Sequence, residues 1–181
     1  MSGHSKWSKV KHQKATTDVV KSFAFTKASR AIAVAVKEGG GMTDPNSNFH
    51  LRLAIERARA VNMPKENIER AVARAGGSGG AAIEHVTYEG YGPGGVAFLI
   101  EAATDNRQRS VSQIKNVLER AGGTLVSPGA LNFLFERRGV VIEPKQGMAI
   151  VLAEEQKRRI DAIVRELEEL DDVQTVVTNL L

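Results

Sequence analysis

The sequence predicts an α+β protein, in which a basic arm and a three-helix bundle precede a domain of antiparallel strands and helices. Three observations lead to this prediction. Apolar residues recur with a helical period in the first 75 of the 181 residues, and a glycine-rich stretch follows them. Beyond it, short strand-like runs alternate with helical patterns. We therefore divide the chain into residues 1–75, a linker at 76–82 and a second domain at 83–181.

The first 16 residues show neither a helical nor a strand period, and they are rich in side chains that can bind phosphate. These are Lys6, Lys9, Lys11, His12 and Lys14. We expect an extended arm that becomes ordered only when it docks. These side chains would bind phosphate groups, and Trp7, the single tryptophan, would contact the partner or anchor the arm.

Three helices are expected after the arm. The first runs from about Asp18 to Lys37 and stops at Gly39–Gly41, and the second covers Asn48–Val61. The third begins at Pro64, a residue that favours the first turn of a helix. At 100° per residue, three cations of the first helix fall within roughly 80° of one another. These cations are Lys27, Arg30 and Lys37, and with Lys21 they extend the predicted phosphate-binding surface.

The second domain is predicted from six strand-like or helical runs that follow a first strand at His85–Glu89. They are Val96–Thr104, a helix at Ser110–Ala121, a hairpin of Leu131–Glu136 and Val140–Glu143, a helix at Ala153–Leu170, and Val173–Thr178. Without the first strand the order is βαββαβ, the ferredoxin-like arrangement. We therefore expect an antiparallel sheet, with an extra amino-terminal strand and both helices on one face.

The charge distribution points to a nucleic-acid partner. Residues 1–75 carry a net charge of +8 and residues 76–181 a net charge of −4. Charge segregated in this way is typical of a protein that binds a polyanion with one half, although a basic half can also serve solubility alone. The absence of cysteine excludes disulfides and thiolate metal sites. No apolar run reaches the roughly 20 residues of a membrane helix, so we expect a cytoplasmic protein.

Two loops remain open to more than one interpretation. Gly90, Gly92 and Gly95 match the GxGxxG pattern, but a strand follows where a dinucleotide site needs a helix. We interpret this loop as a rigid connection between strands in which Tyr91 and Gly92 can still contact a partner. Arg107 and Arg109 could hold a phosphate or an acidic partner, or be plain surface residues.

The sequence carries no recognisable catalytic pattern. The four histidines lack metal-ligand spacing, and the sequence contains neither a GxSxG nucleophile elbow nor a Walker motif. We therefore expect no enzymatic activity, no cofactor, no metal and no small-molecule substrate. A small-molecule-binding α/β domain stays as the third alternative, and a deep pocket beside Gly92 would support it.

Several separated motifs resemble those of the YebC/PmpR family. They are Met1–Trp7 with Lys11–Lys14, Gly39–Gly41, Asn62–Arg70, Tyr88–Val96, Thr104–Arg107 and Leu170–Gln174. The resemblance implies a cytosolic, non-enzymatic transcriptional regulator that binds DNA, with mitochondrial relatives that activate translation and bacterial members linked to the ribosome. It also implies a helical domain plus two α/β domains. Here Glu143–Met148 leads almost directly to the last helix, so we expect one α/β domain to be missing.

Our leading hypothesis is a DNA-binding transcriptional regulatory protein. The alternative is an RNA- or ribosome-associated translation factor, which would need the same basic surface. Phosphate contacts would set the affinity in both cases and would be largely independent of sequence.

Overall fold

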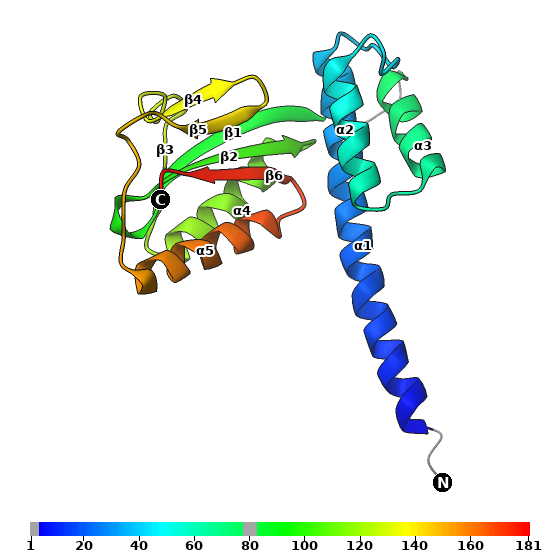
Figure 1. Ribbon diagram of the computed structural model, residues 1–181, viewed down its shortest axis with the longest axis horizontal. Helices are drawn as coiled ribbons and strands as arrows, with labels where there is room; N and C mark the ends of the chain where they lie inside the picture. The colour runs from blue at the N-terminus through cyan, green and yellow to red at the C-terminus, as the bar shows by residue number, and fades with distance from the viewer. Residues whose placement is uncertain (1–3, 78–82) are drawn as a thin grey trace. The chain divides into compact units, whose positions relative to one another are not determined.

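The computed structural model describes the backbone of residues 4–77 and 83–181, with side chains from residue 20 onward in those ranges. The chain divides into two compact units, Met1–Ala81 and Ala82–Leu181, and each has its own core (Figure 1). Most of the expected linker, residues 78–82, lies outside the described residues. None of the helices in the described ranges combines the length and apolar composition needed to cross a membrane.

The first unit consists of three helices, α1 at His4–Glu38, α2 at Phe49–Ala60 and α3 at Lys65–Gly76. Its core joins all three and includes the apolar stripe expected from the helical period. The core residues of α1 are Phe25, Ala28, Ile32, Ala35 and Val36, and they meet Leu51, Ala54, Ile55 and Ala58 of α2 and Ile68 of α3. The bundle is therefore confirmed.

The prediction of an extended arm is wrong for the backbone, because α1 begins at His4 and continues for 35 residues. No glycine or proline interrupts the sequence between His4 and Glu38. A helix nucleated at its packed end grows by one hydrogen bond per residue fixed, so it can extend without further packing. Figure 1 shows the amino-terminal half of α1 extending beyond the ends of α2 and α3.

Asn48 connects the end of α1 to the start of α2. Its side chain is buried, and Oδ1 accepts a hydrogen bond from Leu51 N at 3.0 Å, which caps α2. Nδ2 donates to Ala35 O at 2.9 Å and Met42 O at 3.0 Å. A Cβ atom at Gly39 would lie 2.2 Å from this amide nitrogen, so the close approach requires glycine. The expected stop of the first helix thus also positions α2.

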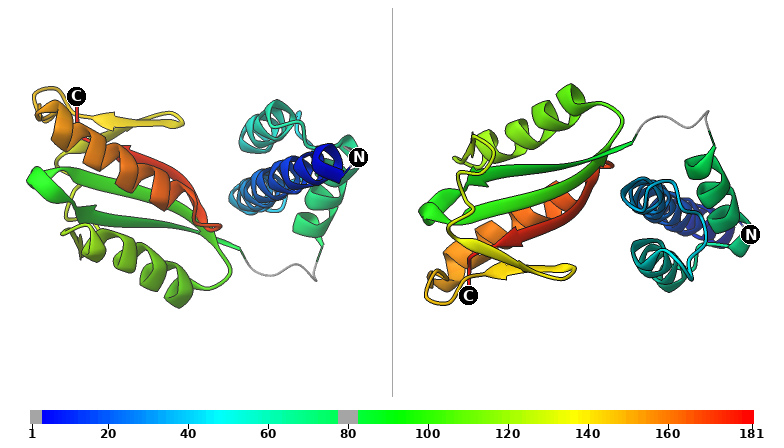
Figure 2. Two further views of the ribbon diagram at one scale, coloured as in Figure 1. Left: turned by 90° about the horizontal axis from the view of Figure 1, so that it is seen from below. Right: turned by 90° about the horizontal axis from the view of Figure 1, so that it is seen from above.

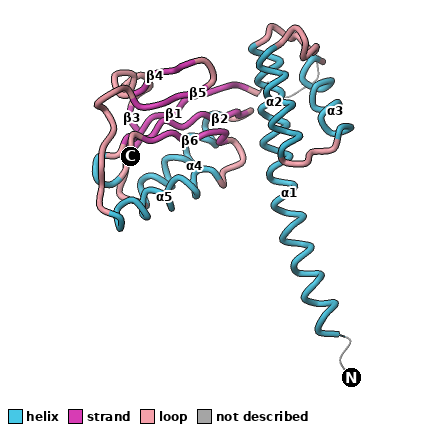
Figure 3. The backbone as a smooth tube through the Cα atoms, in the orientation of Figure 1, coloured by secondary structure: helices cyan, strands magenta, loops and turns pink. Residues whose placement is uncertain are grey.

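The second unit contains two sheets and two long helices, as Figure 3 shows in the colours of strand and helix. Its elements are β1 at Glu84–Tyr91, the 3₁₀ turn η1 at Pro93–Gly95, β2 at Ala97–Thr104, α4 at Arg107–Arg120, β3 at Thr124–Val126, β4 at Phe135–Arg138, β5 at Val141–Pro144, α5 at Glu154–Glu168 and β6 at Val173–Thr178. The main sheet has the order β3-β1-β2-β6, with every neighbouring pair antiparallel. Strands β4 and β5 form a separate hairpin.

The α+β class is confirmed, but two strands have other roles than the sequence suggested. The strand treated as an extra one, β1, is central and lies between β3 and β2. β3 was not expected, and it completes a split β2–α4–β3 crossover around β1. The hairpin was expected inside the sheet, yet its strands pair only with each other.

The alternating side chains of β2 explain why the hairpin stays apart. Phe98 and Ile100 point to the face where α4 and α5 pack, whereas Ala97 and Leu99 point to the opposite face. This second face is covered by residues that follow β3 in the chain, namely Leu131, Leu134 and Phe135, together with Ile142 of β5. Figure 1 and Figure 2 show the helices on one side of the sheet and the hairpin on the other. The prediction of both helices on one face is confirmed.

A short segment closes the second unit at the place where a domain is expected to be missing. Between β5 and α5, Ile150 N donates to Asn179 O at 2.7 Å, and Leu181 N donates to Ile150 O at 2.9 Å. The buried Asn179 side chain donates to Met148 O at 3.0 Å and accepts from Ala97 N at 2.8 Å. The connection is therefore hydrogen-bonded to Asn179 and Leu181, and Asn179 in turn accepts from β2.

Residues 83–181 expressed alone are expected to fold in one cooperative transition. The two faces of the main sheet are both covered by residues of this range, and the connection before α5 is hydrogen-bonded. Urea unfolding followed by far-ultraviolet circular dichroism measures this. If the isolated fragment is unfolded while the full-length chain melts as one unit, the domain boundary lies elsewhere.

Candidate nucleic-acid interface

The predicted phosphate-binding residues of the first unit lie along α1. Lys6, Lys9, Lys11, His12 and Lys14, together with Trp7, fall in the helical segment whose side chains lie outside the described residues. Lys21 and Lys37 are exposed. Lys27 and Arg30 are half-buried, and Lys27 Nζ lies 5.3 Å from the centroid of the Phe23 ring. The basic row on this side of α1 is therefore only partly open to a ligand.

The other two helices add cations to those predicted from the sequence. The exposed basic residues are Arg52, Arg57 and Arg59 on α2 and Lys65, Arg70 and Arg74 on α3. Part of this charge is used internally, because Lys65 Nζ lies 3.6 Å from Glu69 Oε1 and Arg70 is hydrogen-bonded to Asn67. The composition of α2 could have revealed these basic residues from the sequence, because the helix holds three arginines and one acidic residue, Glu56.

In the second unit, Arg107 and Arg109 both engage carboxylates of the chain itself. Arg107 Nε donates to Glu84 Oε2 at 2.7 Å, which joins α4 to β1. Arg109 Nη2 lies 2.7 Å from Asp105 Oδ1 and 2.8 Å from Asp172 Oδ2. Hydrogen bonds to Asp172 and then Asp105 raise the pKa of Arg109. These contacts give both arginines a folding role, and contact with a partner stays a prediction.

Asp172 is the centre of a buried polar cluster that joins two of the sequence motifs. Its side chain is 2% exposed and is paired with Arg109. Ser110 Oγ lies 2.6 Å from Asp172 Oδ2, and Thr104 Oγ1 lies 3.0 Å from the same atom. Its backbone carbonyl accepts from Ala103 N at 2.7 Å. Residues 104–110 and 170–173 are therefore linked, and this links the end of β2 and the start of α4 to the start of β6.

Asn106 explains why α4 begins earlier than expected. Its side chain accepts a hydrogen bond from Arg109 N at 3.0 Å and so caps the helix. The sequence pattern predicted a helix that starts at Ser110. Arg107 and Arg109 consequently lie in the first turn of α4, and not in a loop before it.

The glycine loop is a connection between strands, as expected, since it links β1 to β2 through η1. Gly92 is buried, and a Cβ atom there would lie 2.5 Å from Cε2 of Phe98. Tyr91 is half-buried and packs with the core on the hairpin side of the sheet. Gly94 and Gly95, which have φ values of 72° and 76°, are the exposed part of the loop. The space beside Gly92 is thus filled by the protein itself.

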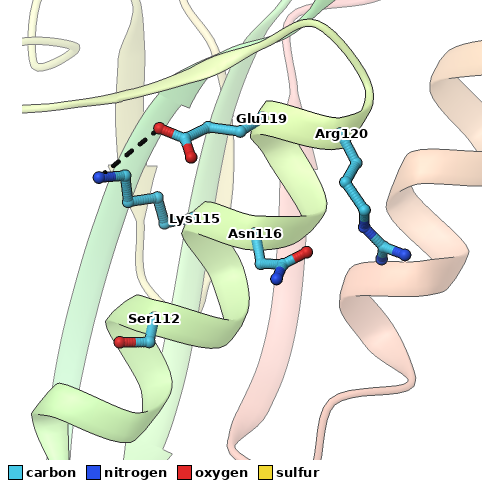
Figure 4. Close-up of a pocket in the computed structure, with 5 residues that line it drawn as sticks. All are labelled: Ser112, Lys115, Asn116, Glu119 and Arg120. Carbon is cyan, nitrogen blue, oxygen red and sulfur yellow. Dashed lines mark ion pairs between the residues drawn. The ribbon is translucent and has the colours of Figure 1, made fainter.

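One shallow depression of about 330 Å³ lies on the outer surface of α4. It is lined by Ser112, Lys115, Asn116, Glu119 and Arg120 (Figure 4). Lys115 Nζ lies 3.6 Å from Glu119 Oε1, and Arg120 is paired with Glu166 of α5. Its charged side chains thus neutralise one another, which does not favour the small-molecule alternative.

Comparison with known proteins places these features in a family. The model of the TACO1/YebC amino-terminal domain matches residues 5–78, and the model described as the TACO1/YebC second and third domain matches residues 83–150. A crystal structure of a conserved hypothetical protein from Aquifex aeolicus, Aq1575, has a TM-score of 0.77 at 30% identity. The match covers 88% of this chain and 90% of that one.

Curated relatives are similar in sequence over nearly the whole of this chain. A protein of Pseudothermotoga lettingae named "probable transcriptional regulatory protein" is 44% identical over 180 residues, 99% of this chain and 70% of its own length. One of Chlorobaculum tepidum with the same designation is 46% identical over 183 residues, 99% of this chain and 71% of its own length. The chain is thus shorter than these two relatives. The resemblance noted from the sequence motifs is confirmed, and the chain belongs to the TACO1/YebC family.

Proposed function

We propose that this protein is a nucleic-acid-binding regulator of the cytosol, whose first unit binds phosphate groups and which acts by binding and not by catalysis. The observation that carries the proposal is the charge of the helical unit. Its first 75 residues have a net charge of +8, whereas the remainder has −4. Lysines and arginines gathered in this way attract a polyanion and release its counterions on binding.

Duplex DNA is the leading partner. The α1 helix of 35 residues is about 50 Å long at 1.5 Å per residue, and its lysine-bearing amino-terminal half extends beyond α2 and α3. The major groove of DNA is wide enough to admit one helix. The regulatory designation of the curated relatives supports the same partner.

RNA, including ribosomal RNA, is the alternative partner. Sequence-specific recognition of DNA needs several donors aimed at base edges. On the described part of α1 the basic row holds Lys27, Arg30 and Lys37, and the first two are half-buried. So few accessible donors favour phosphate contact without strong sequence preference, which suits a structured RNA as well as DNA.

Binding to promoter DNA and to a random duplex of equal length separates the two partners. At near-physiological salt we expect the ratio of the two affinities to stay below the roughly 10³ typical of a dedicated regulator. Co-sedimentation with ribosomes, measured in parallel, tests the RNA partner. A promoter preferred by much more than this ratio would select transcription, and failure to bind any nucleic acid would refute the proposal.

A further inference from the structure

The outer face of α2 carries an exposed aromatic ring, Phe49, beside an arginine and a histidine. Phe49 is 55% exposed, and the core of the bundle is formed without it. The guanidinium carbon of Arg52 lies 5.5 Å from the centroid of the Phe49 ring. The His50 ring meets the same ring edge-on, with centroids 5.9 Å apart and planes at 73°. We call Phe49, His50 and Arg52 the α2 platform.

Helical spacing places arginines on both sides of Phe49. Arg59 follows Arg52 by seven positions, and Arg57 follows His50 by seven, so each pair lies within about 20° on the helix. These four side chains are exposed, and Phe49 lies between the two rows. The single acidic residue of α2, Glu56, follows Phe49 by seven positions and so lies on the same face. The platform is therefore an exposed apolar ring on a surface where three arginines outnumber one carboxylate.

We propose that the α2 platform binds an unpaired nucleotide, whose base stacks on Phe49 while Arg52 and Arg59 contact its phosphate and the next one. The proposal rests on the function proposed above, and it adds that the nucleic acid bound at this surface is single-stranded. A nucleotide matches both properties of this surface, because its base has a flat apolar face and its backbone is anionic.

Stacking predicts selectivity for single strands, since a duplex buries the faces of its bases. The test uses the full chain with oligouridylate and oligothymidylate of about 12 nucleotides, and a duplex of similar length. Phe49→Ala should weaken single-strand binding about tenfold, which is within the range found when stacking residues are replaced by alanine. Duplex binding and the salt dependence should not change, because no charge is removed. The two oligonucleotides show whether RNA or DNA supplies the unpaired base.

Two matched variants complete the experiment. Phe49→Trp should retain single-strand affinity, because tryptophan also stacks, and Phe133→Ala removes a ring that is 57% exposed in the second unit. Equal weakening on single strand and duplex, or none on either, would overturn the stacking platform. Loss of self-association with nucleic-acid binding intact would assign Phe49 to a protein contact and would also overturn it. If the unsubstituted protein binds no nucleic acid, the proposed function fails and the platform with it.

Discussion

Replacement of Asp172 by alanine is expected to lower the unfolding free energy of the second unit by about 3 kcal/mol. The carboxylate is buried and is shared by Arg109, Ser110 and Thr104. Its removal leaves two buried hydroxyl groups and a guanidinium without their common acceptor. Because the Arg109 side chain is 40% exposed, water replaces part of this interaction. The expected destabilisation is therefore at the lower end of the range found for broken buried pairs.

The neighbouring residue supplies the control for this substitution. Asp171 is exposed and belongs to the same motif, so Asp171→Ala should change stability by less than about 0.5 kcal/mol. Urea unfolding of the full chain at neutral pH measures both variants, with the transition of the second unit followed separately where it resolves. Equal effects of the two substitutions would show that the buried cluster does not stabilise the unit.

Exchange of Lys6, Lys9, Lys11 and Lys14 for glutamine is expected to have the largest effect on binding. Removal of one phosphate contact reduces the slope of log K against log salt by about 0.9 for duplex DNA, so removal of four would reduce it by about 3 to 4. Glutamine has nearly the helix propensity of lysine, so the backbone of α1 should persist. Fluorescence anisotropy with a labelled random duplex over a range of salt concentrations gives the slope.

Neutralisation of lysines in the second unit separates local contact from net charge. Lys115→Gln, Lys145→Gln and Lys157→Gln together remove almost as much charge, yet they should leave the slope nearly unchanged. A slope that falls equally in both variants would indicate a nonspecific charge effect. A lower melting temperature of the α1 variant with an unaltered slope would instead give the segment a structural role, with Trp7 as its anchor.

Local signals in the sequence were sufficient for the packed part of the first unit, although not for the start of α1 at His4. The apolar stripe from Phe25 to Val36 and the proline at 64 predicted packing and boundaries that the structure retains. The glycines at 39–41 marked the end of the first helix and Asn48 the start of the second, and the two meet in a tertiary contact. These features act within a few residues of themselves, so a pattern along the chain can reveal them.

Pairing over long distances could not be predicted in the same way. The central place of β1 depends on β3, a strand of three residues with too little pattern to detect. Leu131, Leu134 and Phe135 were interpreted as part of a sheet strand, but they cover the second face of the sheet. The pairing of Arg109 with Asp172 spans 63 positions, and nothing local marks the partner. The Phe49 ring was overlooked because exposure, unlike hydrophobicity, is not visible in one residue.

Ultraviolet crosslinking of the full chain to a nucleic acid, followed by peptide mapping, tests most directly whether the first unit makes the contacts with nucleic acid. We expect crosslinked peptides from α1 and α2, including one that contains Phe49 when the probe is single-stranded. Crosslinks confined to residues 83–181 would contradict this assignment.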